Sequence, residues 1–222
     1  MEIVNTIALT MGTAWASGIN LYATIFMLGI LGAMGYLNLP PDLMVLTDPI
    51  VLFIAALMYF IEFFVDKTPG ADSGWDAIHT FIRIPAGAVL AMGAVGEVNQ
   101  AAELAAFLVG GALAAQSHFV KAGSRVLINT SPEPVSNWTA SFTEDFMVIG
   151  GLWTALNHPV WFLVFLAAFI LISAWLLPRL WRGIKRVVQN IAGFFKGKPA
   201  EDENTHALGK PPRLPDPDPR RK

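Results

Sequence analysis

The chain has 222 residues, of which 54% are hydrophobic and 14% are charged, and its formal net charge is −2. An average soluble domain carries about a quarter charged residues. This composition, with a mean hydropathy of +0.51, therefore excludes an ordinary soluble protein and is typical of a protein solvated by lipid. The chain has no cysteine, which excludes disulfides, thiolate metal sites and a cysteine nucleophile.

The apolar segment 3–36 is too long for one straight span, because as a helix it would reach roughly 50 Å and a bilayer core is about 30 Å thick. Small and polar residues at Ser17-Gly18-Ile19-Asn20 predict a break. We expect a short N-terminal piece that lies at the interface or re-enters, followed by a span that ends at Tyr36. The first residues lack the basic region of a cleavable signal peptide, so we expect the segment to stay in the protein.

Proline, glycine, asparagine and charged residues separate the later apolar segments. Five further spans are predicted at about 49–65, 75–96, 101–126, 138–156 and 159–178. The sequence thus predicts an all-α fold, a polytopic transmembrane helical bundle of about six spans, as one domain over residues 1–178. The polar ends of the spans at 75–96 and 101–126 must be buried in protein or lined by water.

Beyond Pro178, residues 179–196 carry apolar side chains at helical spacing among arginines and lysines. This pattern predicts a basic amphipathic helix at the membrane surface. A simple polybasic stop after the last span would have the same composition. Residues 197–222 are polar and rich in proline, so we expect a disordered cytoplasmic tail.

The lysines and arginines all fall on one side of this map, which holds Lys67, Arg83, Lys121, Arg125 and every cation from Arg179 onward. The loops near 36–48, 97–103 and 157–159 carry acidic residues or histidine and no lysine or arginine. By the positive-inside rule we expect a multi-pass protein of the cell membrane with both termini and both charged hairpins in the cytoplasm.

The two charged hairpins resemble each other. A shift of 63 residues aligns residues 66–77 with 129–140, and six identities fall between residues 69 and 87 where about one or two are expected by chance. We expect an internal duplication of a polar helix–turn–helix hairpin, with repeat cores at about 49–96 and 101–156 in parallel orientation. Two similar loops without duplication are the alternative.

Ionisable residues crowd both hairpins, and such groups at membrane depth are candidates for function because leaving one unpaired in lipid is costly. Asp76, His79 and Arg83 share one helix face at spacing i, i+3, i+7, and His118, Lys121 and Arg125 repeat that spacing. We predict that the hairpins form one ligand-binding cluster. The candidate residues are Glu62, Asp66, Lys67, Asp76, His79, Arg83, His118, Lys121, Arg125, Asn129, Asn137, Glu144 and Asp145.

Simpler roles remain open for single residues. Ser73-Gly74-Trp75-Asp76 and Ser141-Phe142-Thr143-Glu144 both fit the capping box of a helix start. The cations can instead extend to the headgroups, as for Lys67, Lys121 and Arg125. The tryptophans Trp75 and Trp138 can be interfacial anchors.

The sequence gives little support for metal or covalent chemistry. It lacks the helical His-x-x-x-His and Glu-x-x-His pairs of common metal sites, so we predict no metal. It also lacks a nucleophile elbow and a glycine-rich phosphate loop. We therefore predict no cofactor and assign no catalytic residue.

The order of these polar residues resembles a family of small integral membrane proteins known as domain of unknown function 4126. The resemblance covers roughly residues 8–178. It rests on Ala16-Ser17-Gly18-Ile19-Asn20, Glu62, Asp66-Lys67-Thr68-Pro69, Asp76, Arg83-Ile84-Pro85-Ala86-Gly87, His118, Lys121-Ala122, Arg125, Ser131-Pro132, Asn137, Ser141, Glu144-Asp145 and Pro159. The resemblance implies a membrane architecture and marks the polar residues, and it implies no substrate.

We expect a small transporter or a lipid/solute-translocating protein with a polar cavity facing the cytoplasm. The arginines and Lys121 would bind an anionic lipid or small solute, and the carboxylates would pair with them or carry protons. Two alternatives stay open: a membrane-embedded enzyme acting on a lipid headgroup, and an assembly or structural protein. The expected partner is the lipid bilayer; an oligomer is allowed, and the weak net charge gives no support for nucleic acid.

Overall fold

The computed structural model describes residues 2–96, 98–130 and 134–195. The chain divides into two compact units, residues 1–185 and 186–222, and the account below concerns the first. The described helices are α1 (Glu2–Ile19), α2 (Leu21–Ala33), the 3-10 helix η1 (Pro41–Thr47), α3 (Pro49–Val65), α4 (Ala71–Val95), α5 (Gln100–Ile128), α6 (Pro134–Asn157) and α7 (Pro159–Phe195). The predicted all-α fold class is confirmed.

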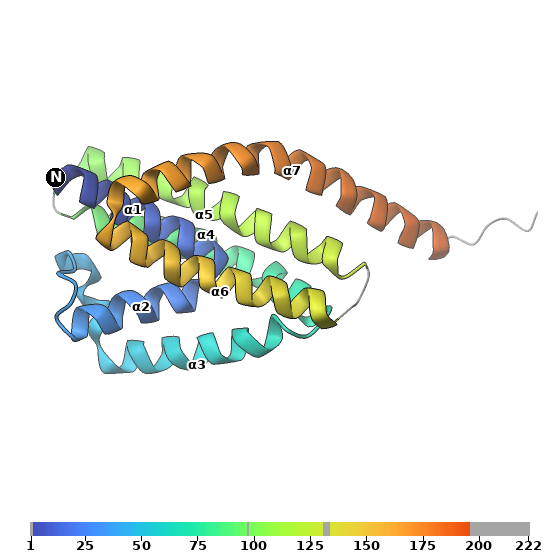
Figure 1. Ribbon diagram of the computed structural model, residues 1–222, viewed down its shortest axis with the longest axis horizontal. Helices are drawn as coiled ribbons and strands as arrows, with labels where there is room; N and C mark the ends of the chain where they lie inside the picture. Colours follow the sequence, from blue (N-terminus) through green and yellow to red (C-terminus); the bar gives the residue numbers. More distant parts are fainter. Residues whose placement is uncertain (1, 97, 131–133, 196–222) are drawn as a thin grey trace, which may run out of the picture. The chain divides into compact units, whose positions relative to one another are not determined.

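The break predicted near Asn20 separates α1 from α2. Asn20 has an extended backbone, and its side-chain oxygen accepts a hydrogen bond from the Ala23 amide, so it is the N-cap of α2. Asn5 and Thr6, at the start of α1, line the same pocket as Tyr36 and Leu37, which follow α2. The two helices therefore enter and leave the bundle at one end, and Figure 1 shows them meeting inside it.

This arrangement differs from the expected full span that ends at Tyr36. With 13 residues α2 is only about 20 Å long, which is too short to cross a bilayer core of about 30 Å. The ten residues from Thr10 to Ile19 are almost all buried, so this half of α1 packs against protein. Residues 2–33 thus form a broken pair of helices that returns to the end of the bundle at which it starts.

The α1–α2 break lies halfway along the bundle because small residues bring the helices together there. Gly18 packs so closely on α5 that a Cβ would lie 2.3 Å from the carbonyl oxygen of Ala114, the middle residue of α5. Gly87 of α4 faces the same residue, and its Cβ would lie 2.5 Å from the Ala114 Cβ. Any larger side chain at Gly18 or Gly87 would push these helices apart.

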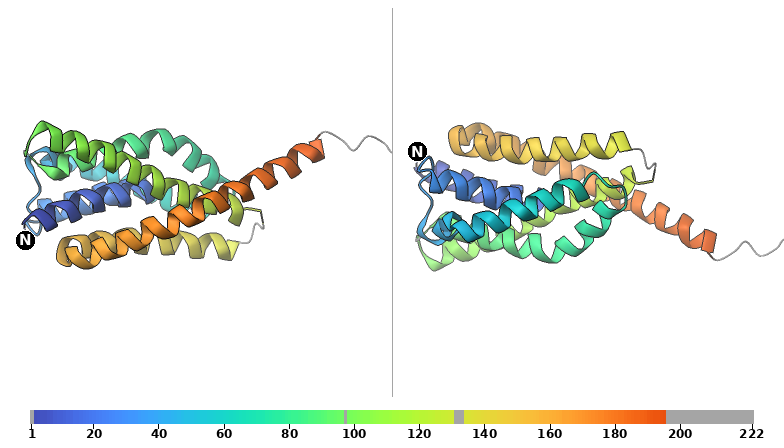
Figure 2. Two further views of the ribbon diagram at one scale, coloured as in Figure 1. Left: turned by 90° about the horizontal axis from the view of Figure 1, so that it is seen from above. Right: turned by 90° about the horizontal axis from the view of Figure 1, so that it is seen from below.

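Helices α3 to α6 run as two hairpins between the same two ends (Figure 1, Figure 2). The α3–α4 and α5–α6 turns share one end, where Asn129 of the second turn donates hydrogen bonds to Asp72 and Ser73 of the first. At the other end, Val95 at the end of α4 and Leu156 near the end of α6 line one pocket. The predicted parallel direction of the two hairpins is therefore present, although the duplication itself stays a prediction.

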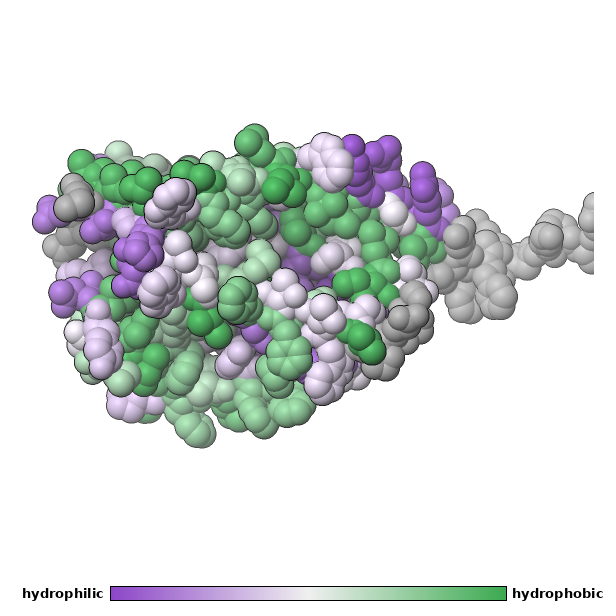
Figure 3. Space-filling view, viewed as in Figure 1, coloured by the Kyte–Doolittle hydropathy of each residue, from purple (hydrophilic) through white to green (hydrophobic). Residues whose placement is uncertain are grey.

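The bundle has an aromatic core and an apolar exterior. Trp15 of α1 is fully buried and packs edge-to-face against Phe162, Phe165 and Phe169 of α7. Large apolar side chains cover the outside, and the face in Figure 3 is predominantly hydrophobic. An exposed surface of this kind suits contact with lipid rather than water.

Three described helices are long and apolar enough to cross a membrane, namely α4, α5 and the 159–189 part of α7. A fourth is counted if the bent pair η1–α3 is one span. The predicted bounds 49–65, 75–96, 101–126 and 138–156 agree with those of α3 to α6 within about four residues, whereas α7 begins at Pro159 as predicted but continues to Phe195 instead of ending at 178. Residues 159–195 form a single helix through Pro178, so the predicted start of a separate helix at 179 is not present. The predicted tail lies outside the described residues.

Candidate functional site

The two predicted stripes of ionisable residues face each other across the α4–α5 interface. Asp76, His79 and Arg83 of α4 are at most 4% exposed, and so are His118, Lys121 and Arg125 of α5. Both sets lie on the inward faces of their helices, as the i, i+3, i+7 spacing predicted. The close packing at Gly87 and Ala114 allows these long side chains to meet.

Arg83 and Lys121 form the centre of a buried charge network. Arg83 donates to Glu62 of α3 at 2.5 Å and to Asp76 at 3.1 Å. The Lys121 Nζ lies 3.2 Å from the same Glu62 oxygen and 2.7 Å from Asp66, which follows α3. Glu62 and Arg83 are fully buried, so these ion pairs have no contact with solvent.

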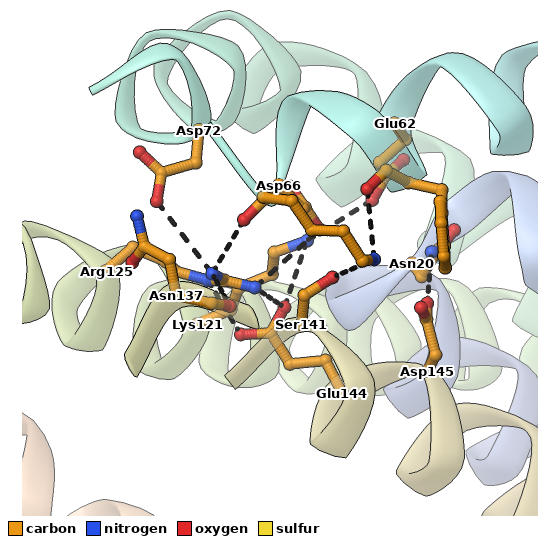
Figure 4. Close-up of polar contacts among 12 residues, drawn as sticks. Asn20, Glu62, Asp66, Asp72, Lys121, Arg125, Asn137, Ser141, Glu144 and Asp145 are labelled. Atoms are coloured by element: carbon orange, nitrogen blue, oxygen red, sulfur yellow. Dashed lines mark hydrogen bonds and ion pairs between the residues drawn. The ribbon is translucent and has the colours of Figure 1, made fainter. Parts of the chain in front are cut away.

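Arg125 connects this network to α6. Its guanidinium donates two hydrogen bonds to Glu144, at 2.7 and 3.1 Å, in the bidentate geometry that favours arginine. It also donates to the backbone carbonyls of Asp66 and Asn137. Figure 4 shows Arg125 and Lys121 of α5 among Asp66 and Glu144. The alternative in which Lys121 and Arg125 extend to the headgroups is therefore wrong, because both side chains point into the bundle.

The two hairpin turns are joined by amide side chains. Asn129 donates to Asp72 Oδ1 at 2.7 Å, and Asn137 of α6 donates to Asn129 Oδ1 at 3.0 Å. Asp72 is fully buried and also accepts from the backbone amides of Gly70 and Ser73. Asp72 thus accepts hydrogen bonds both from backbone amides of its own turn and from Asn129 of the other hairpin.

The alternative interpretation of the two Ser-x-x-acid motifs as capping boxes is wrong. The helices α4 and α6 begin at Ala71 and Pro134, so Ser73 and Ser141 lie inside them. The acids of those motifs, Asp76 and Glu144, bind cations instead of free backbone amides. The sequence pattern was satisfied, but each helix starts earlier than the pattern implied.

Lys67 and Asp145 are charged residues of this region that form no ion pair within 4 Å among the described residues. The Lys67 ammonium donates to Ser141 Oγ at 2.9 Å and lies 3.1 Å from the centroid of the Phe63 ring. Asp145 Oδ1 accepts a hydrogen bond from Asn20 at 3.3 Å. The network thus reaches the break between α1 and α2.

The two histidines lie beside the network and take part in neutral contacts. His79 is stacked on Trp75 and hydrogen-bonded to the Tyr22 hydroxyl at 3.0 Å. His118 Nε2 lies 2.7 Å from Thr80 Oγ1. The Thr80 hydroxyl donates its hydrogen to the Asp76 carbonyl, so His118 Nε2 must carry the hydrogen of that contact. This geometry does not favour His118 Nε2 as a base that activates Thr80.

The network lies near the level at which α4 and α5 pack most closely. Lys121 is two turns from Ala114, about 10 Å along α5, and Arg83 is one turn from Gly87, about 6 Å along α4. Both distances fall within the half-thickness of about 15 Å of a bilayer core. Asp145 lies at the middle of α6. Such groups persist inside a membrane only when they are paired or in contact with water.

Carboxyl groups outnumber cations in this region. Six carboxyls (Glu62, Asp66, Asp72, Asp76, Glu144 and Asp145) face four cations (Lys67, Arg83, Lys121 and Arg125). Within the described part of the chain, one oxygen each of Glu62, Asp66, Asp72, Asp76 and Asp145 is buried without a hydrogen-bond partner. The region therefore holds more carboxyl groups than its four cations can pair with, and a buried charge without a partner is costly.

Burial and neighbouring charges also shift the pKa values of Asp66 and Lys67 in the turn that follows α3. Burial raises the pKa of the Asp66 carboxyl, but Lys121 and Arg125 lower it further, and the net pKa is below the usual value. Burial lowers the pKa of the Lys67 ammonium, and the neighbouring carboxylates offset only part of that change. Asp66 is therefore a stable anion, whereas Lys67 gives up its proton more readily than a solvent-exposed lysine.

The structure brings all thirteen predicted site residues into one region, seven of them in direct ion pairs: Glu62, Asp66, Asp76, Arg83, Lys121, Arg125 and Glu144. Sequence reasoning missed five further members, Asn20, Tyr22, Asp72, Thr80 and Ser141. Asn20 carried a usable signal, because an Asn in the middle of the apolar segment 3–36 needs a partner. Asp72 and Ser141 were identifiable only from the tertiary contacts. No group of three or more metal-ligating side chains occurs among residues the structure describes.

The helices and the buried charges define an all-α protein with the features of an integral membrane protein. The chain belongs to the family described as domain of unknown function (DUF4126), whose model matches residues 7–179. The match covers α1 to the middle of α7 and so includes every residue of the network. No curated protein and no solved structure matches the chain.

Proposed function

We propose that this protein is a small proton-coupled transporter of an anionic group, carried either by a free solute or by a lipid headgroup. The observation that supports the proposal is a charge network, buried among apolar helices and next to a broken helix pair, in which carboxyls outnumber cations. Transporters commonly place their sites at such broken helices near the bilayer midplane. The partly exposed side of the network offers the route from the cytoplasm.

The entry point is Glu144. Its side chain is 16% exposed, whereas Lys121, Arg125 and Arg83 are at most 1% exposed. An entering anion would replace Glu144 on Arg125 and Lys121, which lie 2.7 and 3.5 Å from its carboxylate. The anion would add negative charge to a buried region in which carboxyls already outnumber cations, and a buried unpaired charge is strongly destabilising. Uptake of a proton with each anion offsets the added charge and defines the coupling.

The proposed topology follows from the ends of the helices. Helices α3 to α7 cross the membrane, and α1–α2 re-enters from the side opposite the charged turns. Gly123 of α5 packs on Leu180 of α7. The cations of this part of α7 lie around and beyond that contact, at Arg179, Arg182 and Lys185. By the positive-inside rule the charged turns and this part of α7 face the cytoplasm. The N-terminus then lies on the other side, which replaces the expectation that both termini are cytoplasmic.

The transport test uses the full chain in liposomes under an inward proton gradient. Three probes distinguish the source of the anionic group: inorganic phosphate, succinate and a fluorescent phosphatidylglycerol. We expect one of them to cross faster than in protein-free liposomes, and Arg125→Lys to slow it about tenfold, because lysine loses the bidentate contact. Arg182→Gln, an exposed change on α7, is the matched control. No transport of any probe by the folded protein overturns the proposal.

A structural or assembly role is the second candidate, because Arg83, Lys121 and Arg125 each already have a carboxylate partner. In that case the network only holds the helices together. Arg125→Lys would then change stability without any transport defect. The alternative of a membrane-embedded enzyme acting on a lipid headgroup has no comparable observation in its favour.

A further inference from the structure

We infer that Asp145 is the residue that carries the coupling proton, which reaches it from the cytoplasmic turn past Lys67 and Ser141 and is held at the α1–α2 break by Asn20. This inference rests on the proposed transport function and assigns its proton site. It starts from the fact that Asp145 has no ion-pair partner within 4 Å among the described residues.

Asp145 occupies the position that a proton carrier needs. It lies at the middle of α6, where an unpaired carboxylate is most costly and the neutral acid is favoured. Its Oδ1 accepts a hydrogen bond from Asn20, while Oδ2 is buried without a hydrogen-bond partner. Oδ2 is thus the atom that can receive a proton. Its nearest acidic neighbour along α6, Glu144, is already bound to Arg125.

The groups around Asp145 leave its charge only partly compensated. The Tyr59 hydroxyl of α3 is close to its carboxyl, and Lys67 and Lys121 attract its charge from beyond ion-pair distance. Asp66 and Glu144 repel it. Lys121 itself is held by Glu62 and Asp66. Among the six carboxyls of the network in the described part of the chain, Asp145 is the one without a cation within 4 Å, and we assign the proton to it for this reason.

A row of polar atoms leads to Asp145 from the turn after α3. The Lys67 ammonium, at the cytoplasmic end, donates to Ser141 Oγ at 2.9 Å. Ser141 lies one turn before Asp145 on the same face of α6, since residues i and i+4 are neighbours on a helix. Figure 4 shows Ser141, Glu144 and Asp145 along α6, with Asn20 opposite Asp145. The row ends at Asn20.

The chemistry is a simple proton transfer. A hydronium ion at the cytoplasmic end gives up one proton and leaves as water, and the Asp145 carboxylate becomes the neutral acid at Oδ2. The transfer lowers the negative charge of the network by one. Asn20 can follow the change, because it is the N-cap of α2 and binds Asp145 with its amide group. Protonation is thereby connected to the helix break.

Infrared spectroscopy of the purified full chain tests the assignment without a transported substrate. A buried neutral carboxylic acid gives a carbonyl band that changes with pH. We expect this band in the wild type, and we expect Asp145→Asn to remove it. Asparagine has the shape of the neutral acid, so the variant should fold with the stability of the wild type. Asp42→Asn, an exposed change at the opposite end, should keep the band.

Ser141 provides a second, kinetic readout. Ser141→Ala should keep the band at equilibrium and slow its appearance at least severalfold after a jump to acidic pH, because the row of polar atoms is interrupted. A band that survives in Asp145→Asn, or that disappears in Glu144→Gln instead, overturns the inference. The outcome is independent of the liposome assay. A band assigned to Asp145 in a protein that transports none of the probes refutes only the proposed function. Transport by a protein without that band refutes only the assignment of the proton to Asp145.

Discussion

The ion pair of Arg83 with Glu62 gives the sharpest test of the buried network. Both side chains are fully buried, and the two charged groups are 2.5 Å apart. Arg83→Met keeps an unbranched chain but leaves Glu62 and Asp76 short of a partner. Breaking a buried pair in this way costs roughly 3 to 5 kcal/mol. Lys121 remains 3.2 Å from Glu62, so we expect a loss near the lower limit, about 3 kcal/mol.

A double-mutant cycle separates this contact from the general effect of each substitution. The free energies of unfolding of Arg83→Met, Glu62→Met and the double variant are measured in mixed detergent micelles. The double variant should lose at least about 1 kcal/mol less than the sum of the single losses, because contacting residues couple. Arg182→Met, on the exposed face of α7, is the control and should change stability by less than about 0.5 kcal/mol. Strict additivity with losses no larger than the control would refute the buried network.

Three further predictions concern the broken helix pair. Cysteines introduced at Glu2, Asp42 and Thr68 of this cysteine-free chain test the topology. Those at positions 2 and 42 should be labelled from one side of sealed vesicles, and the one at position 68 from the other side. Labelling of positions 2 and 68 from the same side would contradict the re-entrant pair. Gly18→Val should destabilise the protein by about 1 to 3 kcal/mol in thermal unfolding, because its Cβ would lie 2.0 Å from Ser117 Oγ, and Gly74→Val, with open space around it, should have a smaller effect. Asn20→Ala should cost more than the roughly 1 kcal/mol expected for Asn99→Ala, the exposed N-cap of α5, because Asp145 also loses its hydrogen bond; equal losses would show that Asn20 only caps α2.

The sequence predicted the fold well where hydropathy and breakers act locally. Pro49 and Pro159 start α3 and α7 as expected, and the break at Asn20 falls where small and polar residues interrupt the apolar run. The sequence did not predict that α2 returns to the end of the bundle at which α1 starts. The apolar composition of residues 20–36 is compatible both with a helix that crosses the membrane and with a re-entrant helix. Only the tertiary structure distinguishes the two, since Asn5 of α1 and Tyr36 after α2 line one pocket.

The candidate site was predictable in its residues but not in its pairing. Charges at membrane depth on helix faces can be identified from spacing alone, as for Arg83 and Lys121. Their partners come from other helices, and the choice of Glu62 for Arg83 depends on how closely the helices approach at Gly87. The capping-box interpretation of Glu144 failed for a related reason. The Glu144 carboxylate could bind either a backbone amide at a helix start or a cation that is distant in the sequence. Inside the bundle the buried guanidinium of Arg125 is the stronger partner.

The position of the charges argues that they do more than hold the bundle together. Glycine and alanine contacts already bring α1, α4 and α5 together at Gly18 and Gly87, at the level where the helix pair breaks. Apolar residues in place of a buried ion pair are often as stable as the pair, or more so. A network with more carboxyls than cations is therefore not the simplest way to stabilise this fold. Such a network does have a use if its surplus negative charge takes up protons. Proton uptake would then occur beside a helix break that can respond to it.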